Sequence, residues 1–250
     1  MLRILLHGCC GYMGRVLTEM IAGREDMKIA AGIDMKGEAF ADYPVYSATA
    51  FCKEEADVLV DFSAAPALDA LMDFIEERKI PSVICTTGLS EAQLERLKKI
   101  SEDVPVFRSS NMSLGLNTVY SALRKLAPVL AEAGFDIEIV EKHHRRKLDA
   151  PSGTALSMAE LINESLGGEY SIVLNRSDRR APRDEKEIGI QSVRGGTIVG
   201  DHDVYFAGED ELITISHRAY SRSVFATGAL QAAAFMAGKP AGLYSFEDMM

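Results

Sequence analysis

Short apolar runs alternate with amphipathic stretches through the first hundred residues of the chain, and this pattern narrows the possible folds most. In the first amphipathic stretch, apolar residues recur three and four positions apart, as on one face of a helix. The runs that predict strands are residues 3–7, 28–34, 57–63, 81–88 and 104–110, and the predicted helices begin at residues 13, 66 and 90. Such alternation is typical of a parallel sheet covered by helices on both faces. The sequence therefore predicts an α/β fold with a doubly wound parallel sheet.

The pattern changes after residue 112. A long helix is predicted over residues 113–132, and strand-like runs follow at residues 135–144, 170–176, 187–196, 197–208 and 211–219. One helix begins among them near residue 152, and a last helix is predicted from residue 223 to about residue 237. Closely spaced strands with glycine-containing turns indicate a mixed or antiparallel sheet. We therefore predict a first domain of residues 1–112, completed by the C-terminal helical segment (residues 223–250), and a second α+β domain of residues 113–222 built on a mixed sheet.

Composition argues against several classes of function. The 250 residues carry a formal net charge of −10, whereas a general nucleic-acid-binding protein needs a basic face. No apolar run reaches the roughly 18–20 residues of a membrane span, and glycines interrupt the apolar N-terminus too early for a secretory signal. We therefore expect a cytoplasmic protein without nucleic-acid or membrane partners. One charge-dense stretch, residues 176–187, holds nine ionisable residues and predicts a mobile, solvated loop.

The four cysteines are confined to the first third of the chain, at Cys9, Cys10, Cys52 and Cys85, and they form no C-x-x-C pair. Adjacent cysteines such as Cys9 and Cys10 are poorly placed to share a metal ion. We therefore predict reduced thiols that are mostly buried as small apolar residues, and no metal site.

A glycine-rich loop joins the first predicted strand to the first predicted helix. It consists of Gly8, Cys9, Cys10, Gly11, Tyr12, Met13 and Gly14. Glycines let such a turn tighten and let the backbone approach a pyrophosphate, whose charge the helix N-terminus favours. The spacing G-x-x-G-x-x-G is a variant of the usual fingerprint, but Asp34 lies 20 residues beyond Gly14, where an acidic side chain binds ribose hydroxyls. The loop predicts a Rossmann-type dinucleotide site, and a tight turn in an unrelated α/β protein is the alternative.

Two further loops follow predicted strands at their carboxyl ends, where open α/β sheets bind ligands. The first contains Cys85, Thr86 and Thr87, and the second contains Ser109, Ser110, Asn111 and Met112. Backbone amides and small hydroxyls in these loops are suited to position a nicotinamide ribose or carboxamide. Ordinary turn chemistry is the alternative for each loop.

Residues 141–155 form a strongly basic segment in a chain whose overall charge is negative. Its candidate functional residues are His143, His144, Lys147, Gly153 and Thr154. Ser152 is suited to cap a helix whose exposed first-turn amides, beside a lysine and a histidine, would bind a carboxylate. A solvated strand end is the alternative. Consecutive strand residues point to opposite faces, so we expect no metal shared by the two histidines. Arg222, just before the last helix, is a further cation that we predict to face the cleft and bind substrate, and a solvent-facing side chain is the alternative.

Residues 143–155, HHRRKLDAPSGTA, resemble the H-H-x-x-K-x-D-A-P-S-G-T-A signature of the dihydrodipicolinate reductase family, also called 4-hydroxy-tetrahydrodipicolinate reductases. The similarity runs essentially from end to end. It includes the glycine loop and residues 61–63, 86–88, 111–113, 193–208 and 215–230. A signature of this length, with the other blocks in order, is highly specific for one family.

The resemblance implies an NAD(P)H-dependent oxidoreductase that reduces the cyclic imine dihydrodipicolinate to tetrahydrodipicolinate, on the route to diaminopimelate and lysine. Hydride would pass to ring C4, with His143 as the general acid–base residue and Lys147 as the proton donor. His144, Gly153 and Thr154 would hold the carboxylates of this dicarboxylate substrate. The first domain would bind the cofactor, and the second would bind substrate and assemble a homotetramer.

The cofactor loop departs from the pattern of the family. Tyr12 stands where many members of the family carry a basic residue, and Met35 stands where some carry an arginine. A 2′-phosphate needs such a cation, whereas Asp34 favours a free 2′-hydroxyl. We therefore predict that NADH is preferred over NADPH, which Lys36 still allows.

Two alternatives come from other classes of protein. Another nicotinamide-dependent dehydrogenase of an amino-acid pathway, of the homoserine or diaminopimelate type, would share the first domain but not the basic signature. A non-catalytic dinucleotide sensor would lose His143 or Lys147, and the chain keeps both.

Overall fold

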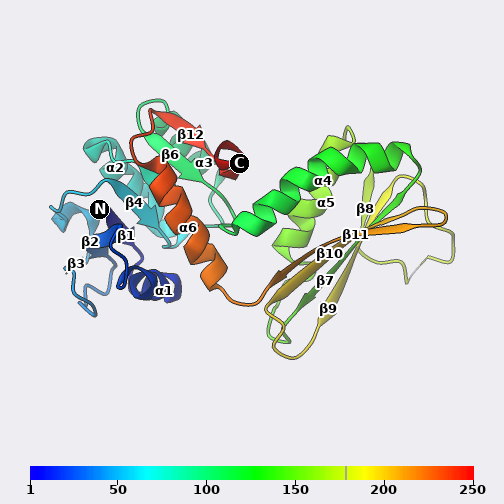
Figure 1. The fold of residues 1–250 in the computed structure, drawn as a ribbon, viewed down its shortest axis with the longest axis horizontal. Helices are drawn as coiled ribbons and strands as arrows, with labels where there is room; N and C mark the ends of the chain where they lie inside the picture. The colour runs from blue at the N-terminus through cyan, green and yellow to red at the C-terminus, as the bar shows by residue number, and fades with distance from the viewer. Residues whose placement is uncertain (178) are drawn as a thin grey trace. The chain divides into compact units, whose positions relative to one another are not determined.

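The computed structural model describes residues 1–177 and 179–250 of the chain. It divides into two compact units, one formed by Met1–Leu114 with Arg222–Met250 and the other by Gly115–Ser221. Figure 1 colours the ribbon by residue number, so the first unit combines the elements from the blue end of the colour bar with those at its red end. The last helix thus lies in the unit in which the chain begins.

The first unit contains a parallel sheet in the order β12-β6-β5-β4-β1-β2-β3. Its strands are β1 (Leu2–His7), β2 (Met27–Ile33), β3 (Val45–Tyr46), β4 (Val58–Asp61), β5 (Ser82–Ile84), β6 (Pro105–Arg108) and β12 (Gly242–Tyr244). Side chains alternate between two cores, so Ile4 and Leu6 pack on one face and Leu5 on the other. Helices α1 (Tyr12–Ile21) and α6 (Ser223–Met236) contribute to the first core, and α2 (Leu68–Arg78) and α3 (Glu91–Ile100) to the second. The predicted doubly wound α/β fold is confirmed.

The segment after the last helix differs from the prediction. Residues 223–250 are not one helical segment, because α6 ends at Met236 and strand β12 follows it. Gly238, with a φ of +75°, and Pro240 account for the end of the helix, since each disfavours its continuation. The sequence also gave no signal for β3, or for the short 3₁₀ turns η1 (Thr49–Phe51), η2 (Ala65–Ala67) and η3 (Phe246–Met249).

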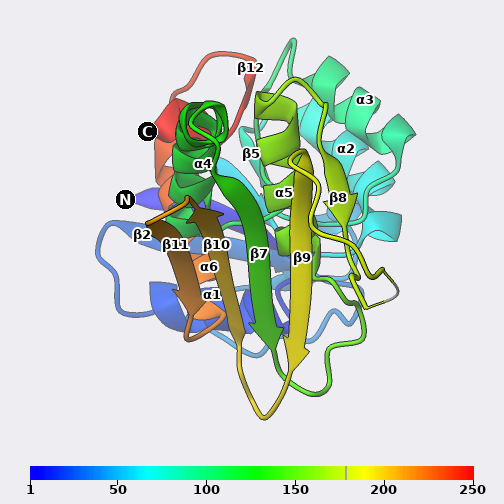
Figure 2. The same ribbon diagram turned by 90° about the vertical axis from the view of Figure 1, so that its right-hand side faces the viewer.

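The second unit contains a mixed sheet in the order β11-β10-β7-β9-β8, as predicted. Its strands are β7 (Asp136–His143), β8 (Ser171–Val173), β9 (Glu187–Arg194), β10 (Gly200–Ala207) and β11 (Leu212–Ala219). Strand β10 is antiparallel to both its neighbours, whereas β9 is parallel to β7 and β8. Figure 2 shows these strands side by side, with α4 (Leu114–Glu132) and α5 (Gly153–Ser165) behind them. Leu123, Met158 and Phe206 are among the residues that bury the helices against the sheet.

The charge-dense stretch at residues 176–187 is attached to this sheet. Arg183 is 17% exposed and binds Asp136 at 2.6 Å and Glu138 at 3.1 Å. Arg176 pairs with Glu138 and with the buried Glu187. The prediction of a solvated loop is therefore wrong for these two arginines, because β7 and β9 present carboxylates to them. Residue 178 lies outside the described residues.

None of the helices within residues 1–177 and 179–250 is both long and apolar enough to cross a membrane.

Candidate functional site

The glycine loop between β1 and α1 closes tightly around backbone atoms. Gly8 has a φ of +78°, and a Cβ at this position would lie 2.6 Å from the carbonyl oxygen of Phe62. A Cβ on Gly14 would lie 2.4 Å from the oxygen of Gly8. Gly11 precedes α1, whose first turn has no side-chain cap and no acidic residue. The start of α1 therefore has N–H groups available for an anion.

Asp34 is held beside this loop. Its Oδ2 accepts a hydrogen bond from the backbone N–H of Cys10 at 3.0 Å, and its Oδ1 accepts one from the backbone N–H of Lys36 at 3.1 Å. Each carboxylate oxygen keeps a second lone pair for a further donor such as a ribose hydroxyl. The glycine turn, the uncapped helix start and this anchored carboxylate together fit a dinucleotide.

The cysteines are free and buried, which confirms the prediction for all four thiols. Burial raises the pKa of Cys9 to about 12 and the pKa of Cys85 well above its usual value. Cys85 can therefore contribute to a ligand site through its backbone only. Sulfur atoms of Cys9 and Cys10 and a carboxylate oxygen of Asp34 lie within 4.8 Å of one another. The absence of a metal site stays a prediction.

A buried polar cluster lies at the carboxyl ends of β1 and β4. His7 Nδ1 donates to Asp61 Oδ1 at 2.7 Å, and Thr86 Oγ1 donates to Asp61 Oδ2 at 2.6 Å. Asp61 is fully buried; burial raises its pKa, but the hydrogen bonds from His7, Ser63 and Thr86 outweigh this and lower the pKa. The sequence predicts no role for His7 or Asp61, although each is the polar last residue of an apolar strand.

The two further loops predicted for the cofactor follow the paired strands β5 and β6. In the second loop, Ser109 Oγ donates to the carbonyl of Asn111 at 2.7 Å, and Asn111 Oδ1 accepts from the N–H of Ser113 at 2.9 Å. Met112 is buried, and a Cβ on Gly228 would lie 1.7 Å from its carbonyl oxygen. Thr87 and Ser110 are exposed. The loops are thus neighbours in the first unit, with Met112 acting as a core residue.

Arg222 belongs to the first unit. Its guanidinium lies over the ring of Tyr12, 5.4 Å from the ring centroid. This contact brings a cation to the start of α1. The other residues predicted to bind substrate lie in the second unit.

In the second unit, His143 is the last residue of β7 and is buried beside Glu141. His143 Nδ1 donates to Glu141 Oε2 at 2.6 Å. Glu141 also accepts hydrogen bonds from Arg194 at 2.7 and 2.6 Å and from the N–H of Ser152 at 3.0 Å. Burial raises the pKa of Glu141, but hydrogen bonds, first those of Arg194 and His143, lower it to about 2.

The start of α5 lies beside this cluster. Ser152 Oγ accepts from the N–H of Ala155 at 3.2 Å, as the predicted N-cap, and is hydrogen-bonded to His202 Nε2 at 3.0 Å. The rings of His143 and His202 meet edge to face at 5.2 Å. Glu141, Arg194 and His202 were missed in the sequence. The two-residue spacing of Glu141 and His143 on a strand was the available signal.

The other predicted substrate residues surround this helix start. Gly153 is exposed and Thr154 half-buried. Lys147 is 23% exposed and pairs with Asp149 at 2.9 Å. The Nδ1 of the half-buried His144 is itself buried and has no hydrogen-bond partner among the described residues. The segment thus combines cations, a capped helix start and an unsatisfied ring nitrogen, an arrangement that suits an anionic ligand.

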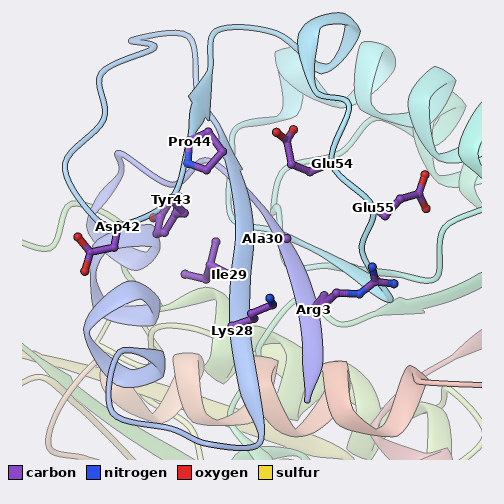
Figure 3. Close-up of a pocket in the computed structure, with 9 residues that line it drawn as sticks. All are labelled: Arg3, Lys28, Ile29, Ala30, Asp42, Tyr43, Pro44, Glu54 and Glu55. Carbon is purple, nitrogen blue, oxygen red and sulfur yellow. The ribbon is translucent and has the colours of Figure 1, made fainter.

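A depression of about 460 Å³ lies elsewhere in the first unit, as Figure 3 shows. Arg3 and Lys28, near the starts of β1 and β2, line it together with Asp42, Glu54 and Glu55. Ligands of open α/β sheets bind at the carboxyl ends of strands. This depression lies at the amino ends, carries charges of both signs and is separate from the glycine loop.

Comparisons with known proteins cover the whole chain. Models described as the N-terminus and the C-terminus of dihydrodipicolinate reductase match residues 2–112 and 115–250. The 4-hydroxy-tetrahydrodipicolinate reductase of Caldanaerobacter subterraneus subsp. tengcongensis is 50% identical over 250 residues, which span 100% of this chain and 98% of the relative. The enzyme of the same name from Clostridium botulinum is 47% identical, with the same coverage. The solved structure of dipicolinate-bound dihydrodipicolinate reductase from Paenisporosarcina sp. TG-14 is 25% identical, with a TM-score of 0.80 and full coverage of both chains.

Proposed function

The chain belongs to the dihydrodipicolinate reductase family, and on that premise we propose that it reduces dihydrodipicolinate to tetrahydrodipicolinate with a nicotinamide cofactor. This step leads towards diaminopimelate and lysine. One observation carries the proposal: His143, His144 and Lys147 lie in one segment that leads into the capped start of α5. The full-length family matches favour this reaction over a dehydrogenase of another amino-acid pathway and over a non-catalytic sensor.

The basic segment supplies what a dianionic substrate needs. The amides of Gly153 and Thr154 at the start of α5 would receive one carboxylate, since a helix N-terminus favours negative charge. The half-buried His144, in the same segment, would supply a further contact for a carboxylate. The relative from Paenisporosarcina binds dipicolinate, a planar dicarboxylate, and this ligand class supports the same assignment here. A role for Arg222 in substrate binding stays a prediction.

His143 and Lys147 are the groups that would manage the proton. A reduced nicotinamide, when bound, would supply the hydride for ring C4. The reduced ring then requires a proton, which Lys147 would donate and His143 would exchange as general acid–base. The cations also stabilise the negative charge that develops on the ring as it is reduced. Loss of one acid–base group lowers a rate by about 10²–10⁴-fold.

The cofactor would be held by the glycine loop from Gly8 to Gly14 and by Asp34, with NADH preferred over NADPH. An anchored carboxylate at this position favours a free 2′-hydroxyl and repels a 2′-phosphate. We expect kcat/KM to be higher with NADH, measured side by side with NADPH. Activity at least tenfold better with NADPH would contradict this, and it would point to Lys36 or Arg222 as the partner of the phosphate.

The test of the reaction is the loss of reduced-nicotinamide absorbance with substrate made freshly from pyruvate and aspartate semialdehyde by the upstream synthase. We expect oxidation that depends on the synthase, and a loss of about 10²-fold or more in kcat for Lys147→Ala. Lys125→Ala is the matched control, because Lys125 is an exposed lysine on α4 of the same unit. Binding of cofactor without any oxidation would defeat the proposed reaction and leave the fold assignment intact.

A homotetramer built through the second unit, which follows from the family resemblance, and a cytoplasmic location complete the proposal. Four chains of 27.3 kDa would give a particle of about 109 kDa. Light scattering of the purified protein measures this mass directly, and a monomer at assay concentration would contradict the tetramer.

A further inference from the structure

We infer that Glu141 is a positioning residue that fixes the orientation and the tautomer of His143, an inference that rests on the function proposed above. The two residues are two positions apart on β7, so their side chains lie on the same face of the strand. Glu141 is fully buried and its Oε2 lies 2.6 Å from His143 Nδ1. None of the roles implied by the family signature falls on Glu141, which stands just before it.

The surroundings of Glu141 hold it as a carboxylate. Arg194, on the neighbouring strand β9, donates from both terminal nitrogens at 2.7 and 2.6 Å, and the N–H of Ser152 donates at 3.0 Å. An ionised carboxylate only accepts hydrogen bonds. In the neutral imidazole, His143 must therefore carry its proton on Nδ1, which leaves Nε2 as the nitrogen that exchanges a proton with substrate.

Space beside that second nitrogen depends on Gly200 at the start of β10. A Cβ at this position would lie 3.1 Å from His143 Nε2. Because residue 200 is a glycine, this position places no side chain against the nitrogen that the tautomer leaves free. The neighbouring ring of His202 packs edge to face on His143 and is directed to Ser152 through its own Nε2.

The same carboxylate also connects His143 to the start of α5. Glu141 accepts from the N–H of the N-cap residue Ser152, and Arg194 donates to the carbonyl of Asp149 at 2.6 Å. One buried ion pair thus fixes both the proposed acid–base group and the loop that precedes the proposed carboxylate site. Glu141 acts through these groups and is not placed in contact with the reacting atoms.

The first test is nitrogen-15 NMR of the histidine rings in the protein without ligands, at pH 9, with the signal of His143 assigned by its loss in His143→Gln. We expect a protonated Nδ1 and an unprotonated Nε2 in the unmodified chain. In Glu141→Gln we expect this signature to change to the other tautomer or to a mixture. A proton on Nε2 of the unmodified chain, or an unchanged spectrum in the variant, would overturn the inference.

The second test is kinetic. We expect Glu141→Gln to lower kcat by about tenfold or more, within the range of general acid–base catalysis, with a smaller change in KM. In a His143→Gln background the same change should lower kcat no further, because the effect of Glu141 on kcat acts through His143. A kcat equal to that of the unmodified chain, or losses that multiply in the double variant, would overturn the inference.

Glu187→Gln is the matched control. Glu187 is also a buried glutamate bound by arginines, and its pKa is likewise lowered to about 2. It stands at the other end of β9 from Arg194, about 23 Å along the strand. We expect this variant to keep kcat and the His143 spectrum, even where its melting temperature falls as much as that of Glu141→Gln. Equal loss of kcat in both variants would reduce Glu141 to a structural role.

Glu141→Gln leaves Arg194 partly buried without its charge partner, which is a strongly destabilising change. If that variant does not fold, Glu141→Gln with Arg194→Gln removes both charges, and the same expectations apply to it. The NMR spectrum of the unmodified chain shows which nitrogen of His143 carries the proton, and it needs no variant of Glu141. An inactive unmodified enzyme would defeat the proposed function, whereas an active one with the wrong His143 tautomer would defeat only this inference.

Discussion

His202 links the folding of this protein to pH at the scale of a single residue. It is almost fully buried, and burial together with the charge of His143 lowers its pKa from 6.5 to about 4. Between these two values the unfolded chain binds a proton that the folded chain does not. The free energy of unfolding therefore decreases as the pH falls from 6.5 to 4, by up to about 3 kcal/mol from this group.

Urea unfolding at several pH values between 7 and 4.5 measures this effect. In His202→Gln, whose amide can keep the contact with Ser152, we expect the pH slope to be smaller by up to about 1.4 kcal/mol per pH unit. Glu141 and Glu187 have pKa values lowered from 4.5 to about 2, so their contribution to the free energy of unfolding is lost mainly below pH 4.5. That loss lies outside most of this pH window. The same slope with and without His202 would contradict the assignment.

The sequence predicts only part of the site at this scale. Ser152 is recognisable as a helix cap and Asp34 as an acid after the second strand, because local chemistry determines both. Glu141, Arg194 and His202 come from three strands whose pairing is not visible in one sequence. A glutamate is written with the same letter whether it is buried or exposed. The role of Glu141 depends on its hydrogen-bond partners, which the sequence does not show.

At the scale of elements, the prediction fails where long-range contacts outweigh local pattern. Helices and long strands follow from apolar periodicity, but β3 and β12 are too short to have one. Residues 176–187 look like solvated charge, yet Arg176 and Arg183 bind carboxylates that β7 and β9 present. The positions of Arg176 and Arg183 are therefore determined by the register of β7 and β9 and not by the composition of the loop.

Gly189 leaves room for the carboxylate of Glu138, and its substitution tests that contact. Gly189 lies opposite Glu138 in the β7–β9 pair, and a Cβ there would lie 1.9 Å from Glu138 Oε2. Gly189→Ala should therefore displace the Glu138 carboxylate from Arg176 and Arg183 and, by weakening these partly exposed ion pairs, lower the free energy of unfolding by about 1 kcal/mol. Gly195→Ala is the control, since a Cβ there meets nothing within 4 Å. Equal stability of both variants by denaturant unfolding would contradict this packing.

At the scale of the whole molecule, the two units differ in how the chain builds them. The second unit is one continuous segment, Gly115–Ser221, and its core comes from that segment alone. The first unit needs both ends of the chain. Its core joins Ile4, Val60 and Phe107 to Ala229 of α6 and to Phe246, whose ring meets that of Phe107 at 5.2 Å.

This difference predicts how fragments behave. Residues 115–221 alone should keep a cooperative thermal transition by circular dichroism, because no residue of their core is removed. Residues 1–114 alone should lose it, because one face of the sheet is left without α6 and the edge of β6 without β12. Co-expression with residues 222–250 should restore the transition, since that segment supplies the missing helix and strand. A cooperative transition in residues 1–114 alone would mean that this part of the first unit folds without the C-terminal segment. A non-cooperative transition in residues 115–221 would mean that the sheet of the second unit needs further chains to fold.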